Sequence, residues 1–133
     1  MTYYLAKSDP ETYSIEQLQK DGTTTWDGVH NYAALIFIKA MKPGDLIYFY
    51  QSQTDKAIVG LMEVVGEPYK NEKDPRTSFV VDVKFKKKYT KHVTLADIKA
   101  EPLCADFALV KQSRLSVMPV PPAVQQWLDT KLA

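Results

Sequence analysis

Leu46-Ile47-Tyr48-Phe49-Tyr50 is an unbroken apolar and aromatic run, and the turn signal Pro43-Gly44-Asp45 stands directly before it. Such a run is typical of a β-strand that is covered on both faces. Residues 57–65 continue the strand pattern, and Gly60 within them marks a bulge or a close backbone approach. Residues 78–89 alternate apolar and polar side chains, which predicts a long strand with one buried and one solvated face.

Helices are expected before and after this group of strands. Ser14 followed by Gln17 has the pattern of a capping box, and Asn31 is placed to cap a helix over residues 32–41. That second helix is apolar on nearly every side, so we expect it to be the buried central helix. Further strands are expected at 3–6 and 114–120, with an extended segment at 23–25 and a connection at 66–76. Three more helices are expected: one that begins at Thr94, one over residues 103–110, and a terminal one that carries Val124, Trp127 and Leu128.

This order of elements predicts an α+β fold: a bent, mostly antiparallel sheet or small barrel, with helices inserted early and late. The 133 residues, of which 45% are hydrophobic and 25% charged, suit one globular domain over residues 1–133. The only cysteine, Cys104, has apolar neighbours and is expected to be a packed thiol in a reducing compartment. The N-terminus lacks the pattern of a signal peptide, and no apolar run approaches the roughly 20 residues of a membrane span. We expect a soluble, cytoplasmic protein, or a nuclear one in a eukaryote.

Signatures of catalysis are missing from the sequence. His30 and His92 are the only histidines, and neither lies near Cys104 or in a ligand-spaced pair. No glycine-rich phosphate loop or nucleophile elbow is present among the five glycines. A hydrolase based on Asp9 or Asp27 is the least favoured alternative. We therefore predict a protein that is not an enzyme, with no catalytic residues, metal or cofactor.

Lysines gather in one short stretch of the expected long strand. The lysines are interrupted only by two aromatic residues and a threonine, so the run has no acidic residue within it. A run of this kind suits contact with a phosphate backbone. A solvated strand face whose lysines discourage aggregation is an equally good interpretation. Because the net charge of the chain is only +1, a nucleic-acid contact has to come from a local patch. The run consists of Lys84, Lys86, Lys87, Lys88 and Lys91.

Trp26 stands in Trp26-Asp27-Gly28-Val29, between two expected helices. Connecting segments lie at the surface and often carry function, so a tryptophan beside a glycine turn is not simply core filler. Its ring is suited to line a pocket and stack on a flat ligand, while polar neighbours bind the ligand's edges. The residues thus predict a binding site around Trp26.

The motifs of the chain, taken in order, resemble the EVE domain family across nearly the whole length. Single motifs of this kind are weak, but the full ordered series is specific. The matching segments are Tyr3-Tyr4-Leu5-Ala6-Lys7-Ser8-Asp9-Pro10, Tyr13-Ser14, Trp26-Asp27-Gly28-Val29-His30-Asn31-Tyr32, Met41-Lys42-Pro43-Gly44-Asp45, Phe49-Tyr50-Gln51-Ser52, Ile58-Val59-Gly60, Glu63-Val64-Val65, Tyr69, Thr94-Leu95, Ile98-Lys99, Ser113-Arg114-Leu115-Ser116-Val117 and Pro119-Val120.

The resemblance implies a PUA-like fold related to YTH and ASCH domains, and a DNA or RNA partner whose modified base enters an aromatic-walled pocket. In that pocket Trp26 would stack on the base, and hydroxyl and amide side chains would bind its edges, namely Ser8, Asn31 and Ser52. Lys7 and Arg114 would meet phosphate, although Arg114 has the alternative of an ion pair with Asp27 or Asp45. The full set carried over by position is Lys7, Ser8, Trp26, Val29, Asn31, Tyr50, Ser52, Arg114 and Ser116.

Some positions differ from the family's usual pattern. Asp9 replaces glutamate, His30 replaces a common arginine, and Gln51 replaces a usual histidine. A polar run after the motif is replaced by apolar residues, which removes hydrogen-bond donors near the expected pocket. These changes favour an alternative ligand for the same pocket, a small nucleobase-like or other ring compound. The apolar replacements are Ala33, Leu35 and Ile36.

Overall fold

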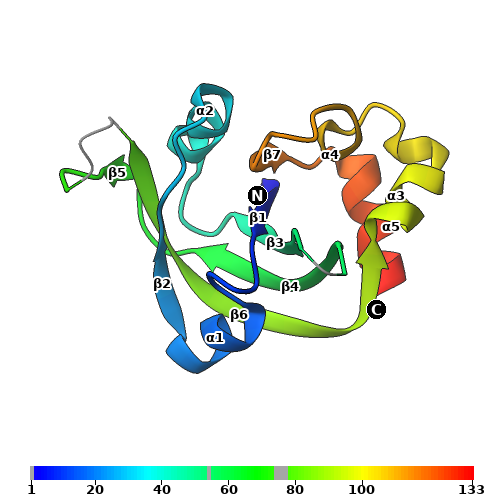
Figure 1. The fold of residues 1–133 in the computed structure, drawn as a ribbon, viewed down its shortest axis with the longest axis horizontal. Coiled ribbons are helices and arrows are strands. Elements are labelled where there is room, and N and C mark those ends of the chain that lie inside the picture. Colours follow the sequence, from blue (N-terminus) through cyan, green and yellow to red (C-terminus); the bar gives the residue numbers. More distant parts are fainter. Residues whose placement is uncertain (1, 54, 74–77) are drawn as a thin grey trace.

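The fold is a bent sheet of seven strands, seen in a computed structural model that describes residues 2–53, 55–73 and 78–133 (Figure 1). Six strands follow the order β2-β6-β4-β3-β1-β7, and β5 pairs with β6 beside them. Only β1 and β3 run parallel among the described pairs, so the expected mostly antiparallel α+β fold is confirmed. The strands are β1 (Tyr3–Ser8), β2 (Thr23–Trp26), β3 (Leu46–Gln51), β4 (Ala57–Val64), β5 (Tyr69–Lys70), β6 (Phe79–Thr94) and β7 (Val117–Pro119).

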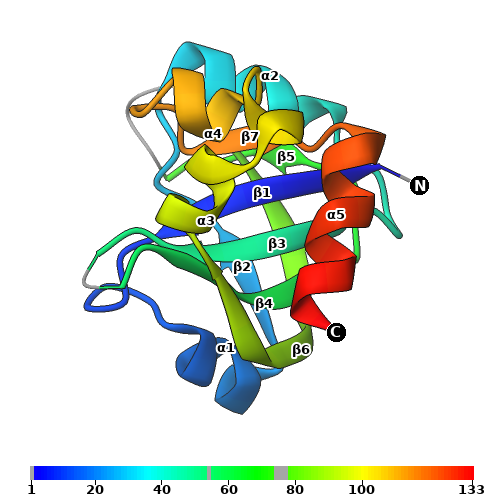
Figure 2. The same ribbon diagram turned by 90° about the vertical axis from the view of Figure 1, so that its right-hand side faces the viewer.

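The helices are α1 (Ile15–Asp21), α2 (Tyr32–Ala40), α3 (Leu95–Ala100), the short 3₁₀ helix η1 (Pro102–Cys104), α4 (Ala108–Lys111) and α5 (Pro122–Leu132). In Figure 2, α2 and α4 lie above the sheet and α1 lies below it, while α3 and α5 lie in front of the strands, with α5 packed against β6. None of the helices in the described ranges is long and apolar enough to cross a membrane.

Local capping signals account for where several helices begin. Asn31 Oδ1 accepts the backbone N–H of Ala34 at 3.1 Å, and Thr94 forms the complete capping box with Asp97. Ser14 accepts from the backbone of Gln17 as expected, but the Gln17 side chain donates to Asp21 instead of closing the box. The capping residues that the sequence marks are therefore the residues that begin these helices.

Some element boundaries differ from the sequence prediction. The expected helix over residues 103–110 is interrupted between Cys104 and Ala108, where Phe107 is buried as the N-cap residue of α4. The closing strand predicted over residues 114–120 is shorter, because only the residues of β7 pair with β1. Conversely, β6 extends to Thr94, and the connection after β4 contains β5; residues 74–76 of that connection lie outside the described ranges.

The prediction that α2 is buried on all sides is wrong. Ala34, Leu35 and Ile38 face the core, and the helix packs against β7 and β6. Tyr32 is 79% exposed and Ile36 is 49% exposed, so one side of an apolar helix faces solvent. The hydrophobic run suggested burial, but a helix at the end of a sheet has a partner on one side only.

The core lies between the two sides of the bent sheet and the helices. The predicted strand β3 is buried on both faces from Leu46 to Tyr50, as expected. Cys104 is fully buried as a packed thiol, and burial together with Glu101 raises the pKa of its thiol. The core also holds Trp26, whose indole meets the Phe49 ring edge to face, with centroids 5.7 Å apart.

Gly60 lies where β4 changes register against both neighbours, which confirms the predicted bulge. A Cβ added there would stand 2.3 Å from Ile15 Cδ1 and 3.0 Å from the backbone oxygen of Lys87. Glycine at this position therefore lets α1 approach the sheet closely.

We expect Gly60→Ala to lower the free energy of unfolding by about 1–3 kcal/mol, the usual cost of overpacking. Gly66→Ala is the matched control, because a Cβ there meets no atom within 4 Å. Adding Ile15→Val, which removes Cδ1, should restore part of the loss. Urea denaturation measures all variants, and equal stability of Gly60→Ala and Gly66→Ala would contradict the close packing.

Candidate functional site

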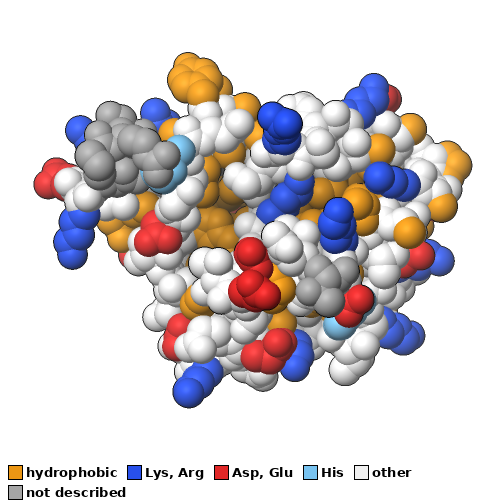
Figure 3. Space-filling view, in the orientation of Figure 1, with side chains coloured by type: hydrophobic (Ala, Val, Ile, Leu, Met, Phe, Trp, Pro, Cys, Tyr) orange, Lys and Arg blue, Asp and Glu red, His pale blue; other side chains and the backbone are white. Residues whose placement is uncertain are grey.

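A pocket of about 470 Å³ opens between the loop after β1 and the loop after β2. Figure 3 shows hydrophobic surface within a hollow on this face, with basic and acidic side chains around it. Its apolar wall comes from Trp26 and Val29, and polar groups from β1, β2 and the two loops complete it. The lining residues are Lys7, Ser8, Asp9, Thr12, Tyr13, Thr24, Thr25, Trp26, Asp27, Gly28, Val29 and Ser116.

Trp26 is both a core residue and a wall of this pocket. It is 8% exposed, and its contact with Phe49 fixes the plane of the indole. Gly28 then turns the chain with φ of 74°, a left-handed conformation that suits glycine. The Trp26-Asp27-Gly28-Val29 stretch therefore ends β2 and immediately bends around the pocket. A ligand would meet a rigid aromatic surface there.

Lys7 brings a positive charge to the pocket from β1. Its Nζ donates to the backbone oxygen of Ser113 at 2.8 Å, which ties β1 to the segment before β7. Burial lowers the pKa of Lys7, and the nearby Lys56 lowers it further. An anionic or acceptor group of a ligand would compensate for this desolvation and for the repulsion by Lys56, so the lysine favours such a group.

Ser8 stabilises the loop after β1, which forms part of the pocket lining. Its hydroxyl donates to the backbone oxygen of Tyr13 at 2.5 Å, and its own backbone oxygen accepts from Ser52 N at 3.0 Å. Asp9 stabilises the same loop, because its carboxylate accepts from the backbone N–H of Glu11 at 3.0 Å. With its proton committed to Tyr13, the Ser8 hydroxyl has only acceptor capacity left for a ligand.

Five of the residues carried over from the family lie together in this pocket. The others lie elsewhere: Asn31 and Arg114 line a second cavity of about 320 Å³, together with Ala33 and the segment 111–115. Tyr50 is buried in the core, and Ser52 follows β3 without lining either cavity. The five residues that share the first pocket are Lys7, Ser8, Trp26, Val29 and Ser116.

Arg114 is exposed, and the pairing with Asp45 considered for it is not formed. The Asp45 carboxylate instead accepts the backbone N–H groups of Thr2 at 3.1 Å and Lys42 at 2.9 Å. Asp45 thereby stabilises the turn before β3. Arg114 is left to face the second cavity, where it can meet a ligand.

The sequence did not predict most of the polar half of the pocket. Those residues flank α1, which leaves the sheet after β1 and returns to it at β2. Their meeting depends on the register between β2 and β6, in which Trp26 pairs with Val81, and no local pattern reveals it. Four of them do stand within the family-like motifs, namely Asp9, Tyr13, Asp27 and Gly28. The additional residues are Asp9, Thr12, Tyr13, Thr24, Thr25, Asp27 and Gly28.

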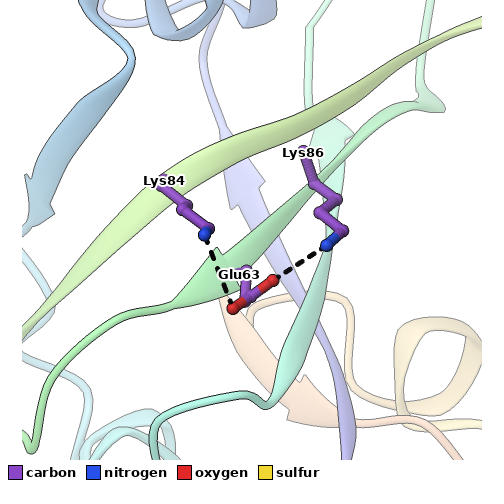
Figure 4. A network of polar contacts seen from close by, with 3 residues as sticks. All are labelled: Glu63, Lys84 and Lys86. Carbon is purple, nitrogen blue, oxygen red and sulfur yellow. Dashed lines mark hydrogen bonds and ion pairs between the residues drawn. The ribbon is translucent and has the colours of Figure 1, made fainter.

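The lysine run of β6 lies away from both cavities and is partly balanced by carboxylates. Glu63 accepts from Lys86 at 3.0 Å and lies 3.8 Å from Lys84 (Figure 4). The hydrogen bond from Lys86 is the main cause that lowers the pKa of Glu63. Lys88 pairs with Glu16 at 3.5 Å. Lys87 lies over the Tyr89 ring, and Lys91 is exposed. These contacts favour the interpretation of the lysine run as a solvated strand face over the interpretation as a phosphate-backbone contact.

The bent, mostly antiparallel seven-stranded sheet with its inserted helices is the architecture of PUA-like domains, a class of binding modules. The chain belongs to the EVE domain family, whose sequence profile matches residues 2–130. It is 34% identical to Homo sapiens thymocyte nuclear protein 1, over 90% of this chain and 68% of that protein.

Solved structures agree with this assignment. Rpa0253 from Rhodopseudomonas palustris superposes with a TM-score of 0.92 at 38% identity, over 99% of this chain and 93% of the other. The human THYN1 protein, whose structure was solved in complex with 5-methylcytosine containing DNA, superposes with a TM-score of 0.89 at 28% identity, over 100% and 99% of the two chains. The expected family and PUA-like fold are thus confirmed.

Proposed function

We propose that this chain is a non-catalytic nucleic-acid-binding domain that takes one nucleobase, preferably a modified one, into the pocket beside Trp26. The observation that carries the proposal is that pocket of about 470 Å³, whose aromatic wall is held rigidly by Phe49. The similar human protein bound to 5-methylcytosine containing DNA supports it. A base reaches such a pocket only after leaving the stack, and an aromatic wall replaces part of the lost stacking.

The polar groups of the pocket suit the edge of a base. The carboxylates of Asp9 and Asp27 are acceptors, as an exocyclic amino group requires. Lys7 Nζ donates one hydrogen bond to the backbone oxygen of Ser113, and its two other N–H groups can donate to a carbonyl or phosphate oxygen. Val29 adds apolar surface of the kind that a base methyl group contacts. The pocket therefore offers both hydrogen-bonding senses and an apolar contact.

A free ring compound is the second candidate ligand for the same pocket. The lining favours it in one respect, since Lys7 is the single cation there among the described residues, against the two carboxylates of Asp9 and Asp27. Salt dependence distinguishes the two ligands, because polynucleotide binding releases counterions and weakens steeply with salt. Binding of a free neutral nucleobase, measured by calorimetry at two salt concentrations, should change little.

Filling the pocket provides the test of the proposal. Ser116→Phe places a ring at the pocket wall and is expected to weaken binding of a 5-methylcytosine DNA oligonucleotide by more than roughly 100-fold, the scale of a lost base-sized contact. Ser116→Ala, the matched control, removes at most one hydrogen bond and should cost less than roughly 10-fold. Fluorescence anisotropy with methylated and unmethylated DNA and RNA measures both. Equal binding by the two variants would contradict the pocket.

A further inference from the structure

The exposed side of α2 presents an unusual apolar pair next to the pocket. Tyr32 at 79% and Ile36 at 49% exposure are one helical turn apart, so their side chains share one side of the helix. Single exposed hydrophobic residues are ordinary, but a nearly free aromatic ring at the edge of a binding site is not. Figure 3 shows hydrophobic surface protruding over α2 on the face that carries the hollow.

The second cavity lies next to Tyr32, at the N-terminal end of α2. Asn31 and Ala33, the two neighbours of Tyr32, line it together with residues 111–115. Within the described part of the chain, its lining holds the cations Lys111 and Arg114 and no carboxylate. Lys111 pairs with Asp106 at 2.8 Å, but both side chains are largely exposed, and such pairs are worth little. A phosphate can therefore replace Asp106 beside Lys111.

The two cavities adjoin each other along the chain. Val29 lines the first and Asn31 the second, and Lys7 of the first donates to the backbone of Ser113 in the second. Three residues span at most about 11 Å, so the Tyr32 backbone lies within that distance of Val29. The N-terminal end of α2 is therefore close enough to the Trp26 pocket to contact a nucleotide next to one bound there.

We propose that Tyr32 stacks on the nucleobase next to the one in the Trp26 pocket, while Arg114 and Lys111 hold the phosphates between them. This inference rests on the proposed function. Extruding one base leaves its neighbour without a stacking partner on one face, and an exposed aromatic ring at that place supplies one. Ile36 extends the apolar surface under the same base. These cations line the cavity that Asn31 and Ala33, the two neighbours of Tyr32, also line.

Anisotropy titrations of a 5-methylcytosine DNA oligonucleotide test this contact. Tyr32→Ala is expected to weaken binding by roughly 5- to 150-fold, the range of one base–aromatic stack. Tyr32→Phe should recover most of the affinity. Leu103→Ala, which removes another exposed apolar side chain (55%) outside both cavities, should leave binding unchanged. Arg114→Ala should lower the salt slope by about one, whereas Tyr32→Ala should not.

Stacking itself is measured with 2-aminopurine placed beside the methylated base, whose fluorescence should rise in Tyr32→Ala relative to the wild type. The inference would be overturned if Tyr32→Ala and Leu103→Ala bound with equal affinity, or if the 2-aminopurine signal did not change. In that case a loss of binding in Ser116→Phe would still support the pocket. Self-association lost in Tyr32→Ala without loss of DNA binding would assign this surface to a second copy and also overturn it. Absence of wild-type binding to any oligonucleotide would overturn both proposals.

Discussion

Trp26→Ala is expected to lower the free energy of unfolding by about 3–5 kcal/mol, as truncations of buried aromatic residues do. The indole is 8% exposed and packs edge to face on Phe49, so its loss leaves a cavity between β2 and β3. The same substitution removes the aromatic wall of the pocket and should abolish base binding. Stability and binding are coupled here because one side chain serves both.

Trp26→Phe separates the two effects. It retains an aromatic contact with Phe49 and should cost less stability, while its smaller ring covers less of a bound base. We expect binding weakened by roughly 10-fold, about half of a base–aromatic stack. Chemical denaturation and anisotropy well below the unfolding transition measure the two quantities. A Trp26→Phe protein that is stable and binds like the wild type would contradict the stacking role.

The second large effect is expected where α5 joins the sheet. The hydroxyl of Tyr48, a fully buried residue, donates to Asp129 Oδ1 at 2.5 Å, and Gln125 donates to the other carboxylate oxygen. Asp129→Ala leaves the buried hydroxyl without its acceptor and should lower the free energy of unfolding by about 1.5–3 kcal/mol. Gln126→Ala, an exposed change on the same helix, is the control and should stay within about 0.5 kcal/mol of the wild type.

The pH dependence of this contact has a defined sign. Burial, followed by the hydrogen bond and the charge of Asp129, raises the pKa of Tyr48 above its ordinary value of 10.0. A raised pKa in the folded state means that this contribution is fully present below about pH 10 and is lost as the pH rises further. The stability difference between the wild type and Tyr48→Phe should therefore be constant from pH 6 to 9 and shrink above pH 10. A difference that grows there would contradict the assignment.

Much of the fold could be predicted because its signals are local. Asn31 and Thr94 begin helices through hydrogen bonds to residues three positions ahead, which any chain with those side chains can form. The all-apolar β3 run and the bulge at Gly60 were equally readable. The exposure of Tyr32 and Ile36 was not, because it depends on whether another element covers α2.

The site was predictable only in part, for a related reason. Trp26 stands in a motif that marks it, but its partner in the pocket wall, Lys7, lies on a strand that β6, β4 and β3 separate from β2 in the sheet. Tyr50 resembled a pocket residue in sequence, yet its place in the middle of the sheet buries it.

The sequence by itself determined the family, the α+β class and the capped helices, and it predicted a binding role for Trp26, since each depends on residues near one another in the chain. The tertiary structure alone decided which residues share the pocket, why Asn31 and Arg114 face a second cavity, and how Glu63 balances Lys84 and Lys86. The physical reason is that these relations follow from strand pairing between segments far apart in the chain, such as β1 between β3 and β7.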